Sequence, residues 1–84
     1  MRIYLQTAVD PDTPPRYYQL LILEDLLEGW TLVREWGAQG SAGRVKRDHF
    51  TTRDEAEQAM IRVRDAQLNR GYRIAFMQGQ EQPL

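Results

Sequence analysis

The sequence predicts an α+β domain in which an antiparallel sheet of about five strands is covered by one amphipathic helix. Two observations carry this prediction. Four strand-like segments separated by turn residues come first, then one segment with helical spacing, then a last strand-like segment. The 84 residues allow one core, and a 42% hydrophobic fraction is enough to build it. We expect a single domain over residues 1–76 and a flexible polar tail over residues 77–84.

The first half of the chain predicts two strands. Residues 2–9 alternate weakly between apolar and polar side chains and are typical of a first strand. Residues 10–15 contain three prolines and two aspartates, which favour a loop because proline cannot donate to a strand ladder. Residues 16–24 are bulky on both faces and predict the central strand. A short Gly-containing connection over residues 25–29 then predicts a hairpin.

The next two strands are predicted on either side of a glycine-rich loop. Alternation over residues 30–36 places Trp30, Arg34 and Trp36 on one face, which is therefore not purely a core face. After the loop, residues 44–50 alternate as a third hairpin strand.

A helix is predicted to begin after Thr52. Thr52 as N-cap and Glu55 three residues later form a capping box. Gly71 is suited to end the helix, and residues 72–76 alternate as a final strand. Residues at helical spacing predict a buried stripe, which comprises Ala56, Ala59, Met60, Val63 and Ala66.

Composition argues against several classes of function. The chain has no cysteine and one histidine, His49, so we expect no metal site, and a structural or surface role for that histidine. Ser41 has no nucleophile-elbow context, and we expect no catalytic residues and no cofactor. No apolar run is long enough for a membrane helix, and the polar N-terminus does not resemble a signal peptide, which fits a cytoplasmic protein.

The middle of the chain is the basic part. The net charge is −1, yet residues 34–53 carry five cations against two acids. An indole beside several cations can stack on a sugar or base while phosphates are neutralised. Trp36 is equally typical of a core residue. The cations are equally typical of an edge strand that resists aggregation, and the glycine loop of an ordinary hairpin. The candidate nucleic-acid-binding residues are Trp36, Gly37, Arg34, Arg44, Lys46 and Arg47.

Several spaced features together resemble the WGR domain. They are Tyr17-Tyr18-Gln19-Leu20, the run from Trp30 to Gly37, the glycine-bearing loop, Phe50, the capped helix and Gly71-Tyr72. WGR domains occur in poly(ADP-ribose) polymerases and as free-standing small bacterial proteins.

In the polymerases the domain helps to recognise DNA breaks, so the resemblance implies that Trp36 stacks on a sugar and that Gly37 permits close approach. The third motif residue is Arg in the family and Ala38 here. In the polymerases that Arg contributes to the interdomain contacts by which the domain relays DNA binding to its neighbours. Because this chain lacks it, the resemblance gives no support to such a relay here. Arg34, Arg44 and Arg47 are the candidate substitutes.

The sequence thus predicts a non-catalytic module that binds DNA or another nucleic acid weakly and in a salt-sensitive way, at ends, nicks or single-stranded features. The alternative is a protein-interaction module, in which a sheet edge or the helix face with Ile61 and Leu68 docks a protein partner or a second copy. A nucleotide is a third class of ligand. A membrane partner is not expected.

Overall fold

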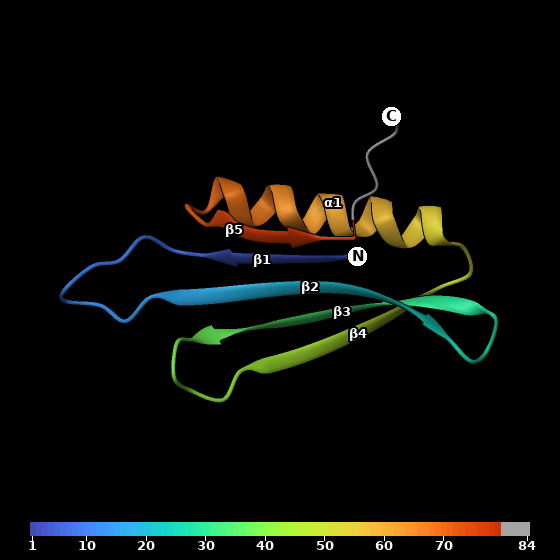
Figure 1. Ribbon diagram of the computed structural model, residues 1–84, viewed down its shortest axis with the longest axis horizontal. Coiled ribbons are helices and arrows are strands. Elements are labelled where there is room, and N and C mark those ends of the chain that lie inside the picture. The colour runs from blue at the N-terminus through green and yellow to red at the C-terminus, as the bar shows by residue number, and fades with distance from the viewer. Residues whose placement is uncertain (80–84) are drawn as a thin grey trace.

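The computed structural model describes residues 1–79 and has five strands and one helix (Figure 1). All strands pair antiparallel in one sheet of spatial order β4-β3-β2-β1-β5, with α1 packed across it, which confirms the predicted α+β class. In these residues, α1 is too short and too polar to cross a membrane. The elements are β1 (Arg2–Gln6), β2 (Arg16–Asp25), β3 (Gly29–Ala38), β4 (Arg44–Phe50), α1 (Arg53–Asn69) and β5 (Arg73–Gln78).

The central position predicted for the second strand is confirmed. β2 lies in the middle of the sheet and pairs along its whole length with β3, from Arg16 opposite Ala38 to Asp25 opposite Gly29. β4 has the predicted bounds and pairs with β3 from Trp36 opposite Arg44 to Trp30 opposite Phe50. β1 ends at Gln6, three residues earlier than the weak alternation predicted.

The sheet has one covered face and one open face. Side chains alternate along each strand, so even-numbered residues of β2, β3 and β4 share a face with Ile3 and Leu5 of β1. This face meets α1 and forms the core, whose buried residues are Ile3, Leu5, Tyr18, Leu20, Ile22, Leu32, Ala56, Ala59 and Met60. Trp30, Trp36 and Val63 pack at its margin.

The helix confirms the predicted start and only part of the predicted stripe. Thr52 is the N-cap, and its capping box with Glu55 is complete. Ala66 was expected to be buried but is exposed, and Gln67 is buried in its place. The physical reason is that Ala66 lines a cleft that opens between α1 and the sheet.

The last strand corrects the predicted alternation. Ile74 pairs with Leu5 and Phe76 with Tyr4, whose side chains lie on opposite faces, because the β1–β5 register shifts between Tyr4 and Leu5. Gly71 has φ 98°, as a helix-ending glycine should. β5 continues through Gln78, and residues 80–84 of the expected tail lie outside the described residues.

We expect Thr52→Ala to lower the stability of the domain by about 1 kcal/mol, because it removes the hydroxyl that accepts the Glu55 amide at 3.1 Å. Thermal unfolding followed by circular dichroism would show this as a melting temperature lower by several degrees. Thr52→Ser keeps the hydroxyl and should melt close to the unaltered protein. Equal losses in both variants would mean that the cap is not the cause.

Candidate nucleic-acid interface

A cleft opens between the C-terminal half of α1 and the covered face of the sheet. Its volume is about 940 Å³, and strands β2, β3 and β4 supply one wall and α1 the other. In the part of the chain that the structure describes, the lining includes five cations and no carboxylate. We call this the basic cleft; its lining residues are Thr7, Arg16, Tyr18, Arg34, Trp36, Lys46, Arg62, Val63, Ala66, Gln67, Arg70 and Tyr72.

Three aromatic rings lie together in the lining of the basic cleft. Trp36 stacks on Tyr18, with ring centroids 5.4 Å apart and planes within 10°. Tyr72, which follows the helix-ending glycine, meets Tyr18 edge-on at 6.1 Å. Tyr18 is buried, while Trp36 and Tyr72 are half-buried. The arrangement fixes the Trp36 indole against the core and leaves part of it exposed, as a stacking residue requires.

The cations of the basic cleft differ in how they are held. Nη2 of Arg34 donates to Oδ2 of Asp48 at 3.3 Å, while its buried Nε has no hydrogen-bond partner in the described residues. Asp48 therefore uses only part of the donor capacity of Arg34. Among residues 1–79, no ion pair engages Arg16, Lys46, Arg62 or Arg70. Their charges are free to meet an anionic ligand.

Three of the six predicted residues come together in the basic cleft: Trp36, Arg34 and Lys46. Arg44 pairs with Trp36 and points to the same face, just outside the lining. Arg47 lies on the open face with Val33, so the structure does not bring it to the cleft.

Gly37 is also on the open face, where an added Cβ would lie 3.1 Å from the Gly43 Cα and 3.6 Å from the Tyr17 ring. The space at Gly37 is thus taken by this chain, and the glycine permits close packing of the hairpin.

The glycine loop folds toward the open face, away from the basic cleft. Nε2 of Gln39 donates to the Tyr4 hydroxyl at 2.8 Å, and Tyr4 stacks on Tyr17 at 6.1 Å. Burial raises the pKa of Tyr17, and its hydrogen bond to Glu35 raises it further. Tyr17 therefore stays protonated and donates to Glu35 at 3.2 Å, a contact that joins β2 and β3 on the open face.

Sequence reasoning missed the other five charged or aromatic residues that line the basic cleft, namely Arg16, Tyr18, Arg62, Arg70 and Tyr72. A signal for two of them was present. Arg62 and Arg70 lie four residues before and after Ala66, so they share one helix face with this member of the predicted apolar stripe. Arg16 could not be found this way, because only the β2–β3 register brings it beside the end of β3.

The residues named for a protein interface lie on α1, outside the basic cleft. Ile61 is half-buried and Leu68 is 38% exposed. His49 has Nδ1 2.7 Å from Oδ2 of Asp25, a structural contact at the β2–β3 turn. In residues 1–79, no three His, Cys, Asp or Glu side chains are grouped so that they could hold a metal ion.

The fold and the basic cleft define a small α+β binding module. The chain belongs to the WGR family: the family model, described as the WGR domain, matches residues 1–79. The WGR domain is a module of the nucleic-acid-binding type and is not itself a catalytic domain. A comparison with curated proteins gives no match.

Proposed function

We propose that this chain binds nucleic acid in the basic cleft, with Trp36 as the stacking residue and the surrounding cations as phosphate contacts. The single observation that carries the proposal is the union of aromatic rings and five cations in one cleft of a chain whose net charge is −1. Aromatic stacking combined with a positive groove is the usual way to hold a nucleotide strand without reading its sequence.

The shape of the cleft favours unpaired nucleotides. The rings lie in a cleft between the helix and the sheet, and a base stacked inside an intact duplex is less accessible to such a site than an unpaired base. A terminal nucleotide, a nicked strand or a single strand can offer its sugar or base to Trp36 while its phosphates meet the rim. We therefore propose a preference for ends, nicks or single-stranded features over intact duplex.

Arg16 supports the proposal at the position where the family motif is incomplete. Ala38 replaces the motif arginine, and Arg16 lies directly opposite it on β2. Both are even-numbered, so they share the covered face, and Arg16 lines the cleft. Arg16 supplies a guanidinium within the lining at this end of the site, whereas Arg44 lies just outside the lining and Arg47 lies on the open face.

The test compares two neighbouring residues that carry the same charge on opposite faces of β4. Lys46→Gln removes a cation from the basic cleft, and Arg47→Gln removes one from the open face. Fluorescence anisotropy of a labelled single strand between about 50 and 200 mM salt should show binding that is strongest at the lower salt concentration and falls as salt rises. Lys46→Gln should reduce the log–log salt slope by about 0.7–1, the value of one phosphate contact.

Arg47→Gln is the matched control and should leave the salt slope unchanged. Equal effects of the two variants would show that binding follows net charge and not the cleft. The absence of binding at the lowest salt concentration, with the protein folded, would overturn the proposed function. A blunt duplex that competes as well as a single strand would overturn the preference for unpaired nucleotides alone.

A further inference from the structure

The turn between β2 and β3 lies at the end of the sheet where α1 begins (Figure 1). It exposes two leucines, at the opposite end of the hairpin from the residues that begin β2 and line the basic cleft. Leu26 is 101% exposed and Leu27 is 84% exposed. Single exposed leucines are common on protein surfaces, but two adjacent ones at the end of a hairpin form an apolar projection. We call this pair the leucine tip.

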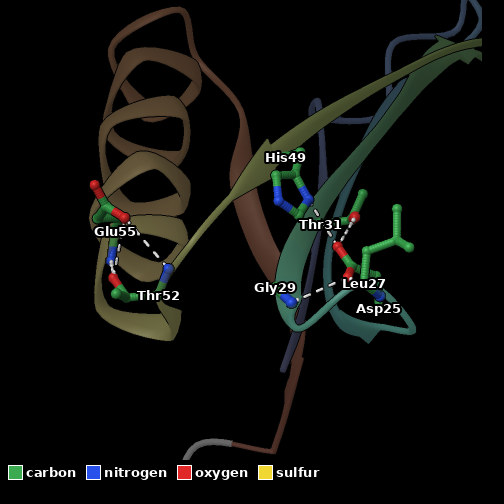
Figure 2. Close-up of polar contacts among 7 residues, drawn as sticks. All are labelled: Asp25, Leu27, Gly29, Thr31, His49, Thr52 and Glu55. Atoms are coloured by element: carbon green, nitrogen blue, oxygen red, sulfur yellow. Dashed lines mark hydrogen bonds and ion pairs between the residues drawn. The ribbon is translucent and has the colours of Figure 1, made fainter.

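The leucine tip is held in one shape by Asp25 (Figure 2). Oδ1 of Asp25 accepts the amides of Leu27 at 2.9 Å and Gly29 at 3.0 Å. Oδ2 accepts the Thr31 hydroxyl at 3.3 Å and lies 2.7 Å from Nδ1 of His49. A turn fixed by four contacts to one carboxylate loses little conformational freedom when it binds.

The same contacts keep Asp25 ionised. Burial alone would raise the pKa of its carboxyl, but the amide hydrogen bonds from Leu27 and Gly29 and the neighbouring His49 outweigh it. The pKa therefore lies below its ordinary value of 3.8. Gly29 has no room for a side chain, since an added Cβ would collide with the His49 ring and lie 2.8 Å from the Phe50 carbonyl oxygen.

The charges around the leucine tip are opposite to those of the basic cleft. Glu24 and Glu28 flank the leucines and are exposed, and Glu28 is fixed at φ 59° within the turn. The basic cleft offers apolar and aromatic surface inside a rim of cations. The two surfaces are separated by the length of β2, ten residues or about 30 Å, so one copy cannot bring them together.

We infer that the leucine tip of one copy docks in the basic cleft of a second copy of this chain. Leu26 and Leu27 enter against Trp36 and Val63, and Glu24 and Glu28 meet the cations of the rim. The contact is head to tail, so a pair of copies leaves one cleft and one leucine tip free, and the assembly grows as an open chain or closes as a ring. This docking depends on the lining of the basic cleft and not on the proposed nucleic-acid binding.

The experiment uses two complementary variants and analytical ultracentrifugation at low salt. The tip variant, Leu26→Ser with Leu27→Ser, keeps the cleft; the cleft variant, Lys46→Glu with Arg62→Glu, keeps the tip. All four positions are exposed, so both variants should fold. The unaltered protein should show mass rising with concentration above the 9.9 kDa monomer, and each variant alone should stay monomeric. An equimolar mixture should form one species of twice the monomer mass and nothing larger.

Three results would overturn the inference. The first is an unaltered protein that stays monomeric up to about 1 mM, a concentration that detects even very weak pairs. The second is self-association that persists in the tip variant, which would assign it to another surface such as β5 or Ile61 and Leu68. The third is a mixture of the two variants that forms no dimer although the unaltered protein associates.

Nucleic acid distinguishes this inference from the proposed function. The tip variant should bind a labelled single strand as the unaltered protein does, because its cleft is intact. Saturating oligonucleotide should dissociate the assembly, since both ligands occupy the same cleft; an assembly that persists at saturation would overturn the placement of the tip. Self-association without nucleic-acid binding would reject the proposed function and support this inference. Nucleic-acid binding without self-association would support the proposed function and reject this inference.

Discussion

Replacing Trp36 with alanine is expected to weaken single-strand binding by about 1–3 kcal/mol, or roughly 5- to 150-fold, because a base or sugar loses its stacking surface. Trp36 lines the basic cleft and stacks on Tyr18, so the indole is fixed before the ligand arrives. Anisotropy titration at constant salt measures the loss. The size of the effect makes it the sharpest test of the role assigned to this residue.

Trp30→Ala is the matched control for this substitution. Trp30 lies on the same strand and face, packs on the same core and has the Arg53 guanidinium 5.4 Å from its ring centroid. It lies at the other end of β3, away from the basic cleft. Both variants should lose stability by similar amounts, and only Trp36→Ala should lose affinity. Equal affinities in the two folded variants would make Trp36 a scaffold residue.

Leu20→Ala is expected to destabilise the domain by about 2–5 kcal/mol, because Leu20 is fully buried at the centre of the core. A chain of 84 residues has a total stability of roughly 4–13 kcal/mol, so this one substitution removes a large share of it. Urea unfolding followed by tryptophan fluorescence would show a lower midpoint with a similar slope.

Leu26→Ala makes the same chemical change at a fully exposed position of the same hairpin. Its free energy of unfolding should match that of the unaltered protein within about 0.5 kcal/mol when the chain is monomeric. A comparable loss in both variants would mean that Leu26 is covered in solution. In that case the measurement should be repeated on dilution, where the head-to-tail contact is absent.

The sheet and helix could be predicted from the sequence because each local signal agreed with the fold. Alternation and turn residues located β2, β3 and β4, and the Thr52–Glu55 capping box located the start of α1. The end of β1 and the faces of Ile74 and Phe76 could not be predicted. The end of β1 depends on where its pairing with β2 and β5 stops. The faces of Ile74 and Phe76 depend on a shift in the β1–β5 register, which no local sequence pattern indicates.

The basic cleft was predicted only in part. Alternation placed Trp36 and Arg34 on one face of β3, and it is the observed β3–β4 register that adds Lys46 to this face. Arg62 and Arg70 come from a helix that crosses the sheet, and Arg16 from a strand that pairs with β3. Their proximity is tertiary, so residues distant in sequence meet only once packing places α1 over β2 and β3.

The separation of charge along the β2–β3 hairpin contributes an electric dipole that the net charge of −1 conceals. Five cations surround one end, and Glu24 and Glu28 lie at the other. In the field of a polyanion such a molecule experiences a torque that turns the positive end inward before contact. More of its encounters then begin in a productive orientation, and association is faster than for a uniformly charged protein of the same net charge. Salt shortens the range of this field to about 10 Å at 0.1 M, so the orienting effect is strong only at low ionic strength.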